Sequence, residues 1–369
     1  MNAYCSAQDE VRMQRYSVVP GNQAAKSHFL LLDGLRGFAA FCVMLIHLGS
    51  WLAVPWIARN SYLAVDLFFC LSGYVLSYAY MGQARSMDSF EFLRVRLLRL
   101  LPLTVLALVI SASYLVARGA FEHAPVPYAE LLNALMLSTF SLPNFSAPAE
   151  IGGPSFFPLN APQYTILLEL TANLVWWRLR HTNLEKVAAA IALACLCVLV
   201  VTGLGGDTPN TFLAGFPRVG ASFFIGIVLY QMRDRLPAWR GWTVTFWLLV
   251  GAMAVLFFWP TELPRVVQLT WVALLSPALV VVGARLQCSG GLASFCSVAG
   301  TVSYPLYCLH FPIFCWINGL YRSFFGAQNF YVEAPIVAVV AIIGSLLAHY
   351  CYDVPIRRYL GARSRRVHA

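Results

Sequence analysis

Long apolar runs, separated by short polar segments, recur along almost the whole chain. At about 1.5 Å per residue, a helix formed by each run is long enough to cross a hydrocarbon core roughly 30 Å thick. We expect ten membrane-spanning helices, near residues 29–54, 61–81, 98–117, 162–179, 187–203, 211–231, 241–259, 265–285, 300–320 and 331–353. The pattern predicts an all-α, polytopic helix bundle in a membrane.

An eleventh apolar run, 128–142, is shorter and is bounded by Pro125, Pro127 and Pro143. If it does not span, twenty of the 25 Lys and Arg residues share one side of the membrane. The five on or near the other side are Arg59, Arg118, Arg218, Arg265 and Arg322. Basic residues concentrate in cytoplasmic segments. We therefore expect both termini in the cytoplasm and 118–160 as a long outer or re-entrant loop.

Composition supports a membrane protein. Of the 369 residues 59% are hydrophobic and only 11% are charged, whereas a soluble domain carries about 25% charged residues. In a membrane protein the net charge of +9 reflects basic residues concentrated in cytoplasmic segments, so no nucleic-acid partner is expected. Residues 1–28 are polar and lack the apolar core of a signal peptide, so they are expected to be a cytoplasmic segment. The transmembrane domain is expected over 29–355, and the basic tail 356–369 is expected to contact anionic membrane lipids.

Several common kinds of site are not indicated. The ten cysteines lie mostly inside apolar runs without metal-type spacing, so they are expected to be packing residues, and no metal site is predicted. A Gly-rich phosphate loop and a G-x-S-x-G nucleophile elbow are both missing from the sequence. Nucleotide folds of the P-loop or Rossmann type and serine hydrolases are therefore unsupported.

The first predicted helix contains ionisable residues, in "LDGLRGFAAFCVMLIHLGSW". Arg36 and His47 are eleven residues apart, about three helical turns, so they share one face, with His47 roughly 16 Å deeper and near the middle of the membrane. Asp33 is close enough to pair with Arg36. A snorkelling arginine and a hydrogen-bonded histidine are one interpretation. A polar passage, with His47 as a base for a hydroxyl proton, is the other.

The spacing Arg36-x10-His47 resembles the first-helix signature of the membrane-bound acyltransferase 3 family. Four further stretches resemble family motifs in the same order: "AVDLFFCLSGYVLS", "RVRLLRLLP", "PQYTILLELTANLVW" and "GTVSYPLYCLHFPIF". The resemblance runs from about residue 30 to 360. This sequence departs from the family pattern at Tyr164, where a Trp is usual, and in having no appended extracytoplasmic domain.

The resemblance implies an O-acyltransferase of the bacterial cytoplasmic (inner) membrane. Such a protein moves an acyl group, often acetyl, from acyl-CoA to a hydroxyl of a glycan or glycoside, with no permanently bound cofactor. It further implies that His47, Arg36 and Glu169 are catalytic. Arg96 and Arg99, which match its R-x-x-R motif, would bind the phosphates of coenzyme A, because guanidinium groups bind phosphate bidentately. Arg94 is expected only to anchor the helix in the interface.

Four other polar residues lie in or at the ends of apolar runs. Glu169 needs a partner or water inside the membrane; it either orients His47, binds the acceptor hydroxyl or caps an internal network. Asn173 is one turn further on the same face. His310 suits a structural hydrogen bond as well as catalysis, and Asp66 suits a helix N-terminus as well as an outer acceptor site.

The residues alone are compatible with two classes of function. In the enzyme, coenzyme A stays at the cytoplasmic face and its pantetheine arm enters the bundle toward His47. In a transporter or flippase for a lipid-linked or glycan substrate, the same polar residues line a path or a proton relay. No inverted repeat is visible in the sequence, which favours the enzyme.

Overall fold

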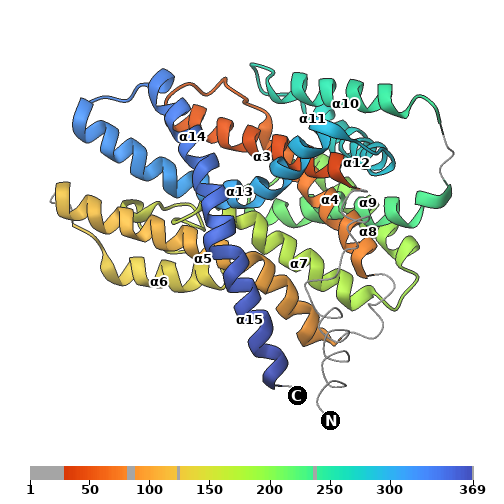
Figure 1. Ribbon diagram of the computed structural model, residues 1–369, viewed down its shortest axis with the longest axis horizontal. Coiled ribbons are helices and arrows are strands. Elements are labelled where there is room, and N and C mark those ends of the chain that lie inside the picture. Colours follow the sequence, from red (N-terminus) through yellow and green to blue (C-terminus); the bar gives the residue numbers. More distant parts are fainter. Residues whose placement is uncertain (1–28, 81–87, 123–124, 236–238, 368–369) are drawn as a thin grey trace, which may run out of the picture.

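The computed structural model describes residues 29–80, 88–122, 125–235 and 239–367, with side chains up to 361. This part of the chain is a bundle of α-helices in which no strand occurs (Figure 1). The predicted all-α architecture is therefore confirmed. The predicted N-terminal segment 1–28 lies outside the described residues.

Every run predicted to span the membrane forms helix. The helices are α3 (Leu30–Trp51), α4 (Ala64–Tyr80), α5 (Ser89–Glu122), α6 (Tyr128–Thr139), α7 (Tyr164–Leu179), α8 (Leu184–Thr202), α9 (Gly215–Gln231), α10 (Trp242–Phe257), α11 (Arg265–Thr270), α12 (Ser276–Arg285), α13 (Gly290–Phe325), α14 (Phe330–Ala348) and α15 (Val354–Val367). Short π-helical turns join α11 to α12 and α14 to α15. Within the described residues, eight helical stretches are long and apolar enough to cross a membrane, and α10 is a shorter apolar helix.

Small residues bring α3 and α13 into close contact. A Cβ atom on Gly34 would lie 2.5 Å from the sulfur of Cys296, and one on Gly37 would lie 2.6 Å from Ala299. These contacts advance in the same direction along both helices, so α3 and α13 run parallel. Close packing through small residues is typical of membrane helices. It fixes the polar face of α3 against α13.

The packing of α4 on α9 follows the same rule. A Cβ atom on Gly73 would lie 2.0 Å from the carbonyl oxygen of Phe223, and one on Gly226 would lie 2.1 Å from that of Cys70. Gly73 therefore permits the close packing of α4 on α9. Cys70 belongs to the main apolar cluster, as expected for a small packing residue.

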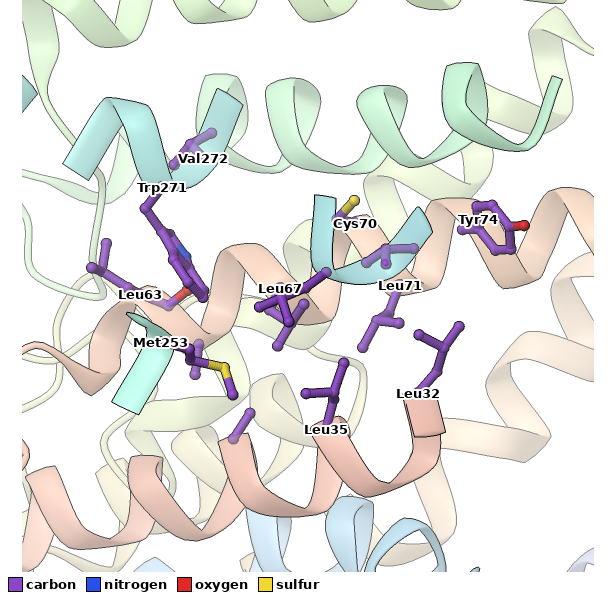
Figure 2. Close-up of a cluster of buried hydrophobic side chains, with 14 of the residues drawn as sticks. Leu32, Leu35, Leu63, Leu67, Cys70, Leu71, Tyr74, Met253, Trp271 and Val272 are labelled. Atoms are coloured by element: carbon purple, nitrogen blue, oxygen red, sulfur yellow. The ribbon is translucent and has the colours of Figure 1, made fainter. Parts of the chain in front are cut away.

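The main apolar cluster is formed by residues that include those of α3, of α4 and of the π-helical turn that follows α11. Figure 2 shows Leu32 and Leu35 of α3 facing Leu67 and Leu71 of α4, with Trp271 at one end. The indole nitrogen of Trp271 donates a hydrogen bond to the carbonyl of Leu63 at 2.8 Å, which satisfies its polar atom inside the cluster. This packing holds α3 against α4.

The run 128–142 forms the twelve-residue helix α6, which is not among the described helices long and apolar enough to cross a membrane. Leu131 and Ala134 of α6 pack against α5 (Figure 1), and the side chain of Gln163, just before α7, donates to the carbonyl of Ser138 at the end of α6. The segment therefore leads back from the end of α5 to the start of α7. In the predicted ten-span topology α3 is the first span and α13 is the ninth, so both cross the membrane in the same direction. This agrees with their parallel packing.

Candidate active site

The guanidinium of Arg36 links α3 to α13. It forms an ion pair with Asp33 at 3.0 Å, which confirms the pairing expected from their spacing. Its Nε donates to the hydroxyl of Ser303 at 2.8 Å and its Nη2 to the carbonyl of Gly300 at 3.0 Å. Arg36 is thus held in one orientation by three partners on two parallel helices rather than extending freely to the membrane surface. Ser303 lies in the "SYPLY" stretch and was not singled out from the sequence.

His47 lies in a stack of rings between α3 and α13. Its imidazole stacks on that of His310, with ring centroids 5.3 Å apart and planes 24° apart, and on the indole of Trp51 at 5.1 Å and 18°. Trp51 also stacks on Phe314 at 4.4 Å. Two histidines far apart in the sequence therefore share one site. His47 is four residues, about 6 Å, from the last residue of α3.

The second histidine has a defined tautomer. The Nδ1 atom of His310 lies 2.9 Å from the carbonyl oxygen of Leu306. A carbonyl oxygen only accepts hydrogen bonds, so a neutral His310 carries its proton on Nδ1 and a lone pair on Nε2. That Nε2 atom is buried and has no hydrogen-bond partner among the described residues. It is therefore suited to accept a hydrogen bond from a substrate group or from water.

Glu169 is held by Arg96 and Ser72. A guanidinium nitrogen of Arg96 lies 2.9 Å from Oε1 of Glu169, and the hydroxyl of Ser72 donates to the same oxygen at 2.7 Å. Arg96 also reaches Asn173 at 3.5 Å, so the predicted shared face of Glu169 and Asn173 is present. The Arg96 side chain is only 4% exposed. Within the described residues it is thus directed at a carboxylate inside the bundle rather than outward to a phosphate.

These charges form one group, which we call the arginine cluster: Asp33, Arg36, Arg96, Arg99 and Glu169. Arg36 pairs with Asp33 and Arg96 pairs with Glu169, and Arg99 lies three residues after Arg96 in α5. Arg99 is the exposed member. Three arginines against two carboxylates leave an excess of positive charge, which suits an anionic group of a substrate. Helices α3, α5 and α7 meet here.

Asp66 lies apart from this cluster, in an ion pair between α4 and α9. Arg218 donates to its two carboxylate oxygens at 3.0 and 2.7 Å, and Ser222 donates at 3.1 Å. The side chains of Asp66 and Arg218 are 0% and 2% exposed. A carboxylate that is fully buried in an ion pair with arginine is not accessible to an acceptor, so we assign Asp66 a structural role in place of the acceptor site considered from sequence.

Two tyrosines of the "SYPLY" stretch fasten α13 to its neighbours. Tyr304 donates to the carbonyl of Leu100 on α5 at 2.6 Å. The hydroxyl of Tyr307 lies 2.8 Å from that of Thr165 on α7. The motif resemblance had marked these segments, and the structure gives the physical reason: they fix the relative positions of the helices that carry Arg96, Glu169 and His310.

The fold and site define a multi-pass membrane protein with a charged cluster and a histidine pair inside its helix bundle. The chain belongs to the acyltransferase 3 family, since the family model described as "Acyltransferase domain" matches residues 29–350. It is therefore a membrane acyltransferase that transfers groups other than aminoacyl groups. The family predicted from the sequence motifs is confirmed.

Similar proteins have related descriptions. The chain is 26% identical to "Acyltransferase MdmB" of Streptomyces mycarofaciens, over 90% of this chain and 92% of that protein. It is 32% identical to "Protein 2 in picA locus" of Rhizobium radiobacter, over 48% of this chain and 97% of that protein. It is 21% identical to "O-acetyltransferase OatA" of Staphylococcus aureus, over 88% of this chain but only 55% of that longer protein. No solved structure matches the chain.

Proposed function

We propose that this protein transfers an acyl group, acetyl by family precedent, from acyl-CoA to a hydroxyl of a glycan or glycoside, with His47 as the general base. The observation that carries the proposal is the half-buried imidazole of His47, which stacks on both His310 and Trp51 and lies on the helix that also carries Arg36. The names of MdmB and OatA support acyl transfer in general and, for OatA, transfer of acetyl.

The proposed reaction is a direct transfer. His47 takes the proton of the acceptor hydroxyl as that oxygen attacks the thioester carbonyl. The carbon–sulfur bond then breaks, and the protonated imidazole returns its proton to the leaving thiolate. The face of the Trp51 ring stabilises the imidazolium while it carries the positive charge. Neutral His310, with its Nε2 lone pair, accepts a hydrogen bond from the acceptor and helps to orient it.

The arginine cluster is proposed to hold the donor. Exposed Arg99 contacts a phosphate of coenzyme A, whereas Arg96 and Glu169 fix each other and shape the path of the pantetheine arm. In this arrangement the donor enters from the side where α5 begins, and the acceptor enters near the end of α3. We place the first side in the cytoplasm and the protein in the inner membrane, on the distribution of basic residues.

The direct test is an assay of purified protein in detergent with acetyl-CoA and a panel of sugars, followed by mass spectrometry. An acylated product supports the enzyme. A transporter or flippase with the same polar residues makes no product under these conditions. Comparison of cell-envelope glycans with and without the gene then identifies the acceptor, since a missing acyl mass marks it.

Replacing Arg99 with alanine is expected to raise the KM for acyl-CoA about fivefold, the loss of roughly 1 kcal/mol from one exposed charge-assisted contact. The turnover number stays near its original value, because the phosphate lies far from the reacting carbon. Steady-state kinetics with varied acyl-CoA measures both. Arg178→Ala, an exposed arginine at the end of α7, is the control. A reduced kcat with an unchanged KM contradicts the assignment of Arg99.

Topology gives a further prediction. With α6 adding no crossing, a cysteine at the exposed position Ser146 is expected to react with an impermeant thiol reagent added outside intact cells. A cysteine at Ser364, in the basic tail, is expected to stay unlabelled until the membrane is opened. The native cysteines are replaced first. Labelling of position 364 and protection of position 146 contradicts the proposed orientation.

A further inference from the structure

An apolar groove lies between the first half of α5 and α15, away from the arginine cluster. Its volume is about 380 Å³. Figure 1 shows α15 passing alongside α5. The aliphatic lining is contributed by Leu93, Leu98, Leu101 and Val105 from α5 and by Ile356 and Leu360 from α15. Its lining residues extend from the predicted span 98–117 into the segment before it and into the segment after 331–353, which places the groove at the basic membrane interface, within reach of lipid acyl chains.

The groove has a basic edge. Arg94 is part of its wall. On α15, Arg357 is held by the carboxylate of Asp353, with its Nε at 2.6 Å, and Arg358 next to it is exposed. The sequence of α15 continues with three more arginines, at positions 363, 365 and 366. The proposed reaction uses Arg96 and Arg99 but leaves Arg94 and all these charges without a role.

We propose that this groove binds one acyl chain of an anionic phospholipid, whose phosphate contacts Arg94. The apolar lining accepts a hydrocarbon chain, and the excess of guanidinium groups favours a negatively charged head group over a zwitterionic one. Basic pockets between membrane helices bind anionic head groups for the same reason. The guanidinium of Arg94 gives the phosphate a bidentate partner.

A lipid bound in this groove also affects the part of α5 that belongs to the arginine cluster. Residues 94, 98 and 101 face the groove, whereas Arg96, on another face of the same helical segment, reaches Glu169. A lipid packed between α5 and α15 restrains this segment, which precedes Pro102 inside α5, and with it Arg96 and Arg99. This consequence rests on the proposed function; the binding of the lipid does not.

Native mass spectrometry of the full-length protein tests the binding. Delipidated protein is titrated with phosphatidylglycerol and, separately, with phosphatidylcholine. We expect one phosphatidylglycerol bound in preference to phosphatidylcholine. Arg94→Gln is expected to lower that preference about fivefold, the effect of one arginine near an anionic head group, without disturbing the core. Leu101→Trp fills the groove and is expected to remove the bound lipid of either kind.

Two matched controls are available. Val109→Trp places the same bulky ring on the same helix at an exposed position outside the groove, and Arg178→Gln removes an exposed arginine elsewhere. Neither is expected to change lipid binding. Equal binding of the two lipids by the wild type, or retention of phosphatidylglycerol by both Arg94→Gln and Leu101→Trp, overturns the proposal. Displacement of phosphatidylglycerol by a long-chain acyl-CoA also overturns it, because the groove then belongs to the donor.

Acyl transfer in nanodiscs tests the consequence for the site. Wild-type protein is expected to have a KM for acyl-CoA several-fold lower in discs containing phosphatidylglycerol than in discs of phosphatidylcholine alone, and Arg94→Gln is expected to lose that difference. If the wild type binds the lipid selectively but transfers no acyl group in either disc, the proposed function fails while the lipid site stands. If it transfers acyl groups with the same KM in both discs, the regulatory consequence fails.

Discussion

Replacing His47 with alanine is expected to lower the rate of acyl transfer by a factor of about 10² to 10⁴, the usual contribution of general acid–base catalysis. The imidazole of His47 is the group proposed to take the hydroxyl proton, and His310 is proposed only to orient the acceptor. Initial rates with saturating acyl-CoA and acceptor measure the loss.

The fold is expected to survive this change. His47 is half-buried, and the close packing of α3 on α13 depends on Gly34 and Gly37, about three to four turns away. Size-exclusion elution and the Tm of the detergent-solubilised protein check this. His181→Ala, at an exposed histidine outside the membrane helices, is the control and is expected to leave activity unchanged. A well-folded His47→Ala protein with near-normal turnover excludes His47 as the base.

The parallel packing of α3 and α13 explains how one helix pair carries both parts of the site. Arg36 binds Gly300 and Ser303, and His47 stacks on His310, so equivalent levels of the two helices meet. One end of the pair contributes to the arginine cluster and the other to the ring stack. Under the proposed function the donor is held at the first and the hydroxyl is activated at the second.

The local pattern of apolar and charged residues was sufficient to predict the helices and the ion pair formed within one helix. Apolar runs of membrane-spanning length became helices, and the spacing of Asp33 and Arg36 gave their ion pair. Both follow from helical geometry alone. The likeness of five motifs to one family added the class of enzyme, which composition and periodicity do not contain.

The sequence pattern did not predict contacts between helices that are far apart in the sequence. Arg96 and Glu169 are 73 residues apart, and Asp66 and Arg218 are 152 apart. A sequence shows that a carboxylate inside the membrane needs a partner, but the choice among several arginines depends on which helices pack together. For this reason Arg96 was expected at a phosphate, Asp66 was left between a helix N-terminus and an acceptor site, and neither Arg218 nor Ser72 was identified as a partner.

Breaking the ion pair between Arg96 and Glu169 is expected to have the second large effect, on stability as well as on activity. Glu169→Gln leaves the guanidinium of Arg96, 4% exposed, without a counter-charge, and removing one partner of a buried pair costs about 3 kcal/mol. Glu169 itself is 21% exposed, so solvent reduces the loss somewhat. The change in Tm and the rate of acyl transfer measure both effects.

A double variant separates stability from function. In Arg96→Met with Glu169→Gln both charges are removed together, so no unpaired charge remains and most of the stability lost in Glu169→Gln is expected to return. Activity is not expected to return, because the donor path loses the two side chains that fix its shape. The exposed pair of Arg235 and Glu185 is the control, and Glu185→Gln is expected to change little. If instead Arg96→Ala keeps its stability and only raises the KM for acyl-CoA, Arg96 serves the phosphates of coenzyme A, as the sequence motif predicts, and Glu169 depends on Ser72 alone.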